Sequence, residues 1–397
     1  MKNLQQKTQA YALKNAISHE GKARQGAVMA GLFNEGLKKQ DIKKYIKEIS
    51  EIIQKINKLS LEEQKVLFEK HKDKTSEREI REGLPELPNV KKGVVMRFAP
   101  SPSGAMHVGH ALTASISFLY IQKYGGKFYV RIEDTNPENI YKPAYKLLKK
   151  DSEWLFKNKA KIIIQSERME LYYKYAKKLI QKKSAYICSC TPEKFREFVK
   201  NKTNCPCKKQ TEKQNLEKWK LMLKGKLENV VLRFKSSMKD PNPAMRDFPL
   251  ARVNKTPHPI QKRKYNVWPL MNLSVTVDDI EMKMTHIIRA KEHRDNAKRQ
   301  KLIYKVLNKK YPWEAYLGRW KFTNMELSAS KITQGIKDGK YSGWNDPKLP
   351  TLQTLKNKYK PETFHKLAEQ RGLSEVDKVI DKKDFFKLLD DIEKIVK

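Results

Sequence analysis

The sequence contains no long hydrophobic run: nowhere in its 397 residues is there a stretch of about 18 apolar residues, the minimum for a membrane-spanning helix. Its first 22 residues also lack the apolar core and the small-residue cleavage site of a signal peptide. We therefore expect a cytoplasmic protein that makes no membrane contact. The length is enough for roughly two to four domains, and hydrophobic residues make up 39% of the chain, so that it can bury real cores.

Cysteine is scarce, and all four cysteines, Cys188, Cys190, Cys205 and Cys207, fall within 20 residues. A disulfide framework would be spread over a secreted chain, so this distribution argues against one. The pattern C-x-C-x₁₄-C-x-C offers four thiolates, which suits a closed, tetrahedral zinc site of the structural type. A group of reduced, metal-free thiols is the alternative.

Acidic residues are few: 45 Asp and Glu stand against 84 Lys and Arg, which gives a formal net charge of +39. A surface this positive attracts polyanions through its long-range field, so nucleic acid and phosphate-bearing substrates are the expected ligands. The alternative is a lysine-rich composition without functional meaning, because most of the excess is lysine.

Apolar residues recur at three- and four-residue spacing through residues 1–88, which predicts a helical N-terminal region. Within it, Ser60 followed by Glu63 is typical of a capped helix start. The segment "EGLPELPNVKKG" (82–93) holds two prolines and two glycines, and we interpret it as a linker.

Short apolar runs and helical stretches alternate after this segment, starting with "GVVMRF", which predicts a parallel sheet with crossover helices. The fold class is therefore α/β, with a nucleotide-binding parallel sheet. Residues 89–186 would form its first half and residues 263–322 its second half, split by an insertion at 187–262 that carries the cysteines. Residues 323–397 form a basic, mostly helical end segment.

The stretch "FAPSPSGAMHVGH" (98–110) follows the first predicted strand and leads into a helix. In open parallel sheets this position binds nucleotides. Gly109 allows a ligand to approach the backbone, and the helix start favours phosphate. His107 and His110 can donate hydrogen bonds to phosphate oxygens as charge develops in a transition state.

This stretch resembles the first signature of class I aminoacyl-tRNA synthetases in the form used by glutamyl and glutaminyl enzymes. "RIEDTNP" (131–137), "SVTVDD" (274–279) and "THIIRAKEH" (285–293) fit the same group. "LSASKITQGIKDGKYSGWNDPKLPTL" (327–352) is similar to the second signature of archaeal-type glutamyl-tRNA synthetases and the residues after it. Ala329 stands where the general pattern has its second lysine, and Lys331 comes two residues later.

The resemblance implies an α/β class I Rossmann-type fold that activates L-glutamate with ATP and Mg²⁺ and transfers it to tRNA(Glu). His107, His110 and Lys331 would be catalytic. The implied ATP-binding residues are these three with Ala99, Pro100, Ser101, Gly109, Ser328 and Ser330. We expect Ser328, Ser330 and Lys331 to lie on a flexible loop that closes over the triphosphate.

The resemblance also implies a glutamate pocket formed by Arg97, Glu133, Asn272 and Arg289. The two guanidinium groups would hold carboxylates, and Glu133 would hold the substrate's amino group. Arg289 favours glutamate over glutamine, because the glutaminyl enzymes lack an arginine there. Met271 replaces the tyrosine that the family commonly has, so Asn272 or water would have to orient the substrate.

The insertion corresponds to the part of the family that grips the tRNA acceptor end and in several members holds zinc. Archaeal-type enzymes usually continue into β-barrels that read the anticodon, whereas this sequence ends in "DDIEKIVK" soon after the second signature. We expect a truncated or split enzyme, with a separate anticodon-binding chain as one alternative. The sequence leaves open whether tRNA(Gln) is charged as well.

Two other classes of function remain as alternatives at this stage. The first is a non-catalytic tRNA-binding or assembly module that kept the fold. The second is a small-molecule nucleotidylyltransferase, which shares the H-x-G-H element. A non-catalytic module would not need to retain the expected site residues, which are His107, His110, Arg97, Glu133 and Lys331. A nucleotidylyltransferase would need neither Arg289 nor the cysteine insertion.

Overall fold

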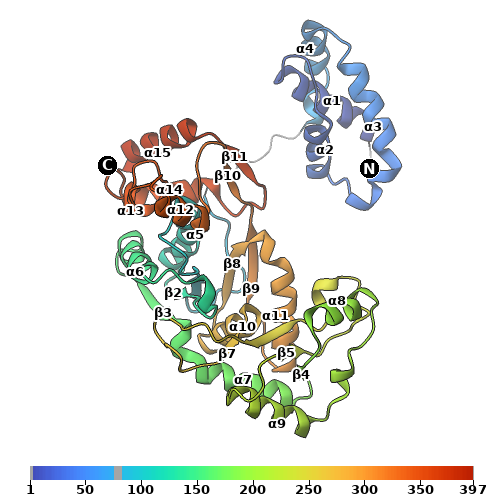
Figure 1. The fold of residues 1–397 in the computed structure, drawn as a ribbon. Helices are drawn as coiled ribbons and strands as arrows, with labels where there is room; N and C mark the ends of the chain where they lie inside the picture. The colour runs from blue at the N-terminus through green and yellow to red at the C-terminus, as the bar shows by residue number, and fades with distance from the viewer. Residues whose placement is uncertain (1–2, 76–82, 397) are drawn as a thin grey trace. The chain divides into compact units, whose positions relative to one another are not determined.

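The computed structural model describes residues 3–75 and 83–396. The chain divides into two compact units, Met1–Arg81 and Glu82–Lys397 (Figure 1). We call the second one the catalytic unit, because it contains the residues that the resemblance predicts to be catalytic, and describe each unit by itself.

The first unit is all helical, as predicted. Its described residues, 3–75, form four α-helices: α1 (Leu4–Ile17), α2 (Gln25–Asn34), α3 (Ile42–Ile56) and α4 (Leu61–Glu69). Leu13, Leu32 and Ile53 belong to their common core. The predicted capping box is confirmed: the Ser60 side chain accepts from the Glu63 N–H, and the Glu63 carboxylate accepts from the Ser60 N–H. These bonds satisfy backbone donors that a helix start leaves free.

The catalytic unit is built on a parallel sheet, which confirms the predicted α/β class. Strands β1 (Val94–Phe98), β2 (Gly126–Ile132) and β3 (Ala160–Ile164) pair in parallel in the order β1-β2-β3. Helix α5 (Val108–Tyr124) connects β1 to β2, and α6 (Ala144–Leu155) precedes β3.

The predicted second half of the sheet lies at the free edge of β1. Strands β8 (His286–Ala290) and β9 (Trp313–Leu317) pair in parallel. The Thr285 N–H donates to the Val95 carbonyl at 3.0 Å, which connects the start of β8 to β1. Strands β2, β1 and β8 are therefore neighbours, and their carboxyl ends lie at one edge of the sheet.

The described part of the predicted linker, residues 83–93, is packed against the catalytic unit. The Pro85 carbonyl accepts from the Tyr120 hydroxyl at 2.8 Å, and the Leu87 N–H donates to the Tyr124 hydroxyl at 3.1 Å. The prolines shape an extended segment that covers helix α5, and the division between the two units falls before it.

The cysteine-bearing insertion contributes to an antiparallel sheet of β4 (Ala185–Cys188), β5 (Val231–Phe234), β6 (Pro249–Val253) and β7 (Val267–Pro269), which starts before residue 187 and ends after residue 262. Its helices are α8 (Pro192–Lys200) and α9 (Glu212–Leu223). This sheet shares one hydrophobic core with α7 (Met169–Gln181), α10 (Met271–Glu281) and α11 (Arg294–Val306). The core thus extends across both expected boundaries, 186/187 and 262/263.

The end segment contains helices α12 (Ala329–Lys337), α13 (Leu352–Leu355), α14 (Pro361–Arg371) and α15 (Lys382–Val396), and its strand β11 (Lys378–Ile380) pairs with β10 (Trp320–Phe322), which directly precedes the segment. Helix α14 packs on α5, and Phe364, Leu367 and Phe385 belong to the same core as the parallel sheet. The end segment is therefore part of the catalytic unit. Across the described residues, no helix is both long and apolar enough to cross a membrane.

Candidate active site

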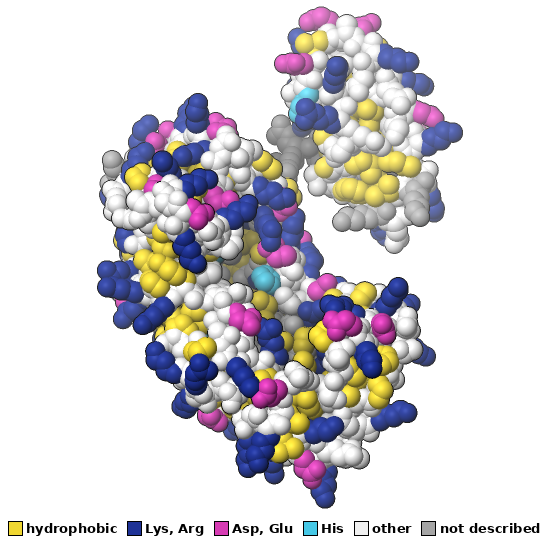
Figure 2. All heavy atoms as spheres, viewed as in Figure 1, with side chains coloured by type: hydrophobic (Ala, Val, Ile, Leu, Met, Phe, Trp, Pro, Cys, Tyr) yellow, Lys and Arg dark blue, Asp and Glu magenta, His cyan; other side chains and the backbone are white. Residues whose placement is uncertain are grey.

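A cavity of about 720 Å³ lies where β1, β2 and β8 end and α5 begins. Figure 2 shows the catalytic unit hollowed on this face, with Lys and Arg side chains spread over the surrounding surface. Six residues predicted from the first signature line the cavity: Ala99, Pro100, Ser101, His107, Gly109 and His110. The Glu133 N–H donates to the Pro100 carbonyl at 2.9 Å, which fixes this loop to the end of β2.

The two histidines lie against each other at the start of α5. Their rings are stacked with centroids 3.7 Å apart and planes inclined by 20°. His107 is the residue that caps the helix, because its Nδ1 accepts from the Gly109 N–H at 3.1 Å and from the His110 N–H at 3.4 Å. The local pattern H-x-G-H thus produces both the helix start and the ring pair.

Both imidazoles are neutral at physiological pH. Burial lowers the pKa of His107 well below its usual value, with a further contribution from His110, and burial lowers the pKa of His110 to about 4. Since Nδ1 of His107 accepts two bonds, its proton is assigned to Nε2, which remains a donor. Within the described residues, Nδ1 of His110 has no partner. The pair therefore offers neutral hydrogen-bonding groups to a ligand.

Three residues of the predicted glutamate pocket, Arg97, Glu133 and Arg289, line the same cavity. They come from β1, from the residue after β2, and from β8, so three adjacent strands bring them together. Arg289 donates to Gln300 Oε1 at 2.9 Å, while its buried Nε has no acceptor among the described residues. A buried, unsatisfied guanidinium N–H favours an anionic ligand.

Arg97 already has a partner that the sequence analysis did not assign. Its Nε lies 3.3 Å and its Nη2 3.5 Å from the two carboxylate oxygens of Asp279. Burial opposes ionisation of Asp279, but Arg97 and Arg131 outweigh it and lower the pKa of this carboxyl. Arg97 therefore reaches the cavity as a guanidinium that is held in place by a carboxylate behind it.

Arg131 lies at the centre of this charge network and is completely buried. It donates to Asp279 at 2.7 Å and to Glu133 at 3.1 Å, and its Nε lies 3.6 Å from Asp278. Burial raises the pKa of Glu133 against the opposing effect of Arg131 and Arg97. The network orients Glu133 toward the cavity through Arg131.

The second signature is placed differently from the prediction. Ser328 caps helix α12 and lines the cavity, but Ser330 and Lys331 lie in the first turn of that helix and not on a loop. Lys331 does not line the cavity: its side chain is 73% exposed and lies 3.4 Å from Glu326. The Ser328 hydroxyl accepts from the Lys331 N–H, so capping turns the serine-rich stretch into a helix start.

Asn272 also departs from the prediction. It is buried at the start of α10 and does not line the cavity, whereas its neighbour Met271 does. Because successive residues at a helix start point in different directions, only one of the two can face the ligand. Met271 is 40% exposed, and its sulfur accepts from the Asn296 amide at 3.5 Å.

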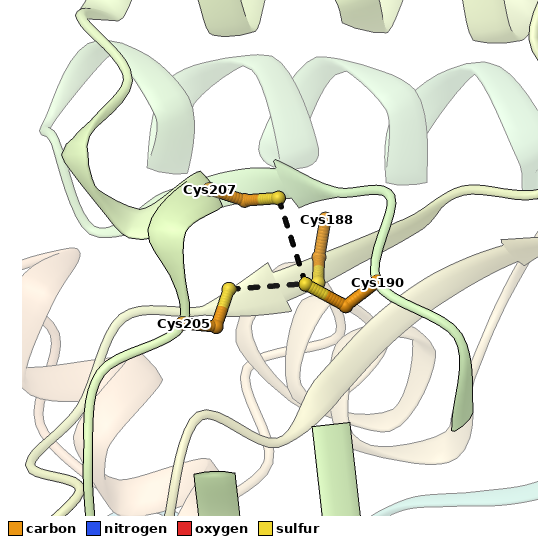
Figure 3. Close-up of side chains that lie close together, drawn as sticks. All are labelled: Cys188, Cys190, Cys205 and Cys207. Atoms are coloured by element: carbon orange, nitrogen blue, oxygen red, sulfur yellow. Dashed lines mark hydrogen bonds between the residues drawn. The ribbon is translucent and has the colours of Figure 1, made fainter. Parts of the chain in front are cut away.

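The four cysteines converge on one point of the insertion (Figure 3). Their sulfur atoms all lie within 4.8 Å of one another, and the Cys188–Cys205 and Cys190–Cys207 pairs are each 3.8 Å apart. Four thiolates at about 2.3 Å from a zinc ion form a tetrahedron with edges of about 3.8 Å. The donor set and its spacing therefore fit zinc.

The sequence analysis missed Asp151, Arg131, Asp278 and Asp279 as parts of the site. Each is at most 2% exposed. The available signal was a charge within an apolar stretch, as in "YVRI" and "VTVDDI". A charge in such a place has to be paired inside the protein. Asp151 lies on α6, where burial raises its pKa to about 7 against the effect of Lys356.

Comparisons with known proteins agree with this geometry. Residues 93–393 match the family described as tRNA synthetases class I (E and Q), catalytic domain. The glutamate–tRNA ligase of Methanocaldococcus jannaschii is 42% identical over 94% of this chain and 68% of its own length. Those of Thermococcus onnurineus and Methanobrevibacter smithii are 40% and 38% identical over 95% and 98% of this chain, and over 68% and 71% of their own lengths.

Two solved structures share the fold. A glutamate tRNA ligase from Elizabethkingia meningosepticum, in complex with its amino acid, superposes with a TM-score of 0.51 at 22% identity, over 70% of this chain and 60% of that one. The glutamate-tRNA synthetase of Elizabethkingia anophelis gives a TM-score of 0.53 at 20% identity, over 75% of this chain and 70% of that one.

The chain therefore belongs to the class I tRNA synthetases of the E and Q group. Within that group it belongs to the glutamate–tRNA ligase family, whose archaeal members it matches over most of its length. It is accordingly an enzyme that ligates glutamate to tRNA and uses ATP to do so.

Proposed function

We propose that this cavity activates L-glutamate as glutamyl-adenylate and then transfers it to the terminal ribose of tRNA(Glu). The observation that carries the proposal is the meeting of stacked His107 and His110 with Arg97 and Arg289 in one cavity. The glutamate α-carboxylate attacks the α-phosphate of ATP, a new C–O–P bond forms, and pyrophosphate leaves. Positioning and neutralisation of charge supply most of the catalysis in such a reaction.

Each side chain has a role in this scheme. His107 and His110 donate to phosphate oxygens as the transition state gains charge. The N-terminus of α12, which begins after the capping residue Ser328, favours the binding of the triphosphate. Lys331 would act by exchanging Glu326 for a phosphate, because its exposed side chain has no second carboxylate partner among the described residues. Mg²⁺ would neutralise the leaving pyrophosphate when bound.

Specificity for glutamate would come from the two arginines. Arg97 and Arg289 offer planar forks that match carboxylates, and Glu133 offers the negative charge that a substrate ammonium requires. If glutamine bound in place of glutamate and its neutral side-chain amide were poorly placed, the Nε of Arg289 would be left without an acceptor.

Charging of purified tRNA(Glu) and tRNA(Gln) by this chain alone, with ATP and glutamate, tests the proposal. Glutamyl-tRNA(Glu) is the expected product. The same assay on tRNA(Gln), and repeated with an extract of the source cell, reports whether the second tRNA is a substrate and whether a separate anticodon-binding chain contributes. Tight tRNA binding without charging and without ATP–pyrophosphate exchange would instead support a binding module.

Replacing Arg289 with alanine is expected to lower kcat/KM for glutamate by about 10- to 150-fold, because a hydrogen bond to a charged group contributes about 1.5–3 kcal/mol. The kcat/KM of Arg289→Lys should lie between those of the unchanged chain and Arg289→Ala, since lysine keeps the charge and loses the planar fork. The measurement is tRNA-dependent ATP–pyrophosphate exchange, in which the KM for ATP serves as the control. Unchanged use of glutamate by Arg289→Ala would remove this residue from the pocket.

We also propose that Cys188, Cys190, Cys205 and Cys207 hold one structural zinc ion. Metal analysis of protein purified without chelator should give about one zinc per chain. Cys205→Ser should lower both the metal content and the thermal stability, because binding of a structural metal contributes directly to folding. Thr203→Ala, at an exposed residue of the same stretch, is the matched control. Metal-free protein that unfolds at the same temperature with and without added zinc would refute the site.

A further inference from the structure

We propose that Asp151 is a positioning residue for glutamate activation, which acts by holding the backbone of Met106 and thereby the imidazole of His107. The inference rests on the proposed role of His107. Asp151 belongs to helix α6, does not line the cavity and so does not contact the substrates.

The first contact is between the carboxylate and the signature loop. Asp151 Oδ2 accepts from the Met106 N–H at 3.1 Å, and both residues are completely buried. Met106 directly precedes His107, whose own Nδ1 is engaged in capping α5. A shift of the backbone at Met106 therefore changes the position of the His107 ring.

The second contact joins the same carboxylate to the end segment. Asp151 Oδ1 accepts from the Gln353 amide, and Lys356 Nζ lies 3.9 Å from it. Lys356 in turn donates to Gln353 Oε1 at 3.2 Å. Gln353 is on α13, so one buried carboxylate connects α6, the signature loop and the end segment.

The loop is held on its other side by that segment. The Leu352 N–H donates to the Met106 carbonyl at 2.8 Å, and the Val108 N–H donates to the Pro350 carbonyl at 3.0 Å. The two peptide groups that flank His107 are thus fixed by residues 350–352, and the peptide group before Met106 is fixed by Asp151. Of these anchors, Asp151 is the only one made by a side chain among the described residues, so it can be removed by substitution.

The chemistry explains why this anchor affects rate more than binding. When a catalytic hydrogen-bond donor is displaced by about 1 Å, it stabilises the transition state much less, whereas the contacts that bind the substrates in the ground state remain. We expect Asp151→Ala to lower kcat of tRNA-dependent ATP–pyrophosphate exchange by about 10- to 100-fold, with KM for glutamate and ATP within about twofold of the unchanged chain. Asp151→Asn should recover most of kcat, since an amide oxygen can still accept from the Met106 N–H.

A double-substitution cycle separates positioning from a general effect on folding. If Asp151 acts through His107, Asp151→Ala should cost less than about twofold in a His107→Ala background. Glu393→Ala is the matched control: Glu393 is a buried carboxylate that accepts from the Lys360 N–H and the Thr363 hydroxyl, away from the loop. It should lower the thermal unfolding temperature and leave kcat within about twofold.

Several results would overturn the proposal. A folded Asp151→Ala chain with unchanged kcat, or one that loses the same factor in both backgrounds, shows that the carboxylate does not act through His107. Asp151→Leu is the second variant, because leucine fills the space of the carboxylate with an apolar group. If neither Asp151→Ala nor Asp151→Leu folds, the carboxylate is a requirement of the fold and the proposal fails. A His107→Ala chain with full exchange activity would refute the assigned role of His107 itself, which is a separate failure.

Discussion

Replacing His110 with alanine should lower the rate of glutamate activation by about 10²- to 10³-fold, the usual cost of removing one preorganised donor from a transition state. His107→Asn should cost about as much. Asparagine is a good helix cap, so this variant keeps the acceptor that α5 needs and removes the imidazole N–H. Rates of tRNA-dependent ATP–pyrophosphate exchange at saturating substrates measure both effects.

The physical reason lies in the pair's surroundings. Burial keeps both rings neutral, with the pKa of His110 at about 4, so neither repels the other and each is a hydrogen-bond donor of fixed position. Such donors cost no reorganisation when charge develops on the phosphate.

The matched control for the histidine variants is His365→Gln. His365 is also buried and uncharged, and its Nε2 bonds the Leu155 carbonyl outside the cavity. It should change stability without changing the rate of exchange in the folded protein. A loss of less than about threefold for both cavity histidines would mean that they do not contact the reacting phosphates.

Much of the fold followed from local patterns. The apolar run at β1, the glycine that ends α5 and the alternation of strands with helices correctly indicated a parallel sheet. The parallel sheet places Arg97, Glu133 and Arg289 at one edge, because the carboxyl ends of parallel strands meet at the same edge of a sheet.

Other features depend on contacts between distant segments and were out of reach of local patterns. The partner of Arg97 is Asp279, 182 residues away, and nothing in either neighbourhood identifies the other. Residues 83–93 look like a linker by composition, yet Leu87 is buried in the core of the sheet. Lys331 was assigned by analogy of motif and Asn272 as a substitute for the missing tyrosine, and neither argument specifies the direction of a side chain on a helix.

Arg131→Met should be the most destabilising of these substitutions. Arg131 is completely buried and contacts Asp279, Glu133 and Asp278, so its removal leaves carboxylates in the interior without their common cation. Removing one partner from a buried ion pair costs about 3–5 kcal/mol, because the remaining charge must stay desolvated or be protonated. We expect a loss of that size in the free energy of unfolding.

Denaturant unfolding followed by tryptophan fluorescence measures this loss in the catalytic unit alone, because all six tryptophans of the chain lie between residues 154 and 344. Arg168→Met is the matched control. Arg168 also pairs with Asp278, at 2.7 Å, but its side chain is 25% exposed, and Asp278 keeps the bonds that it accepts from Gln165 and Tyr172, so the loss should be smaller than for Arg131→Met. Equal losses for the two variants would mean that burial of the charges around Arg131 does not set the cost of removing it.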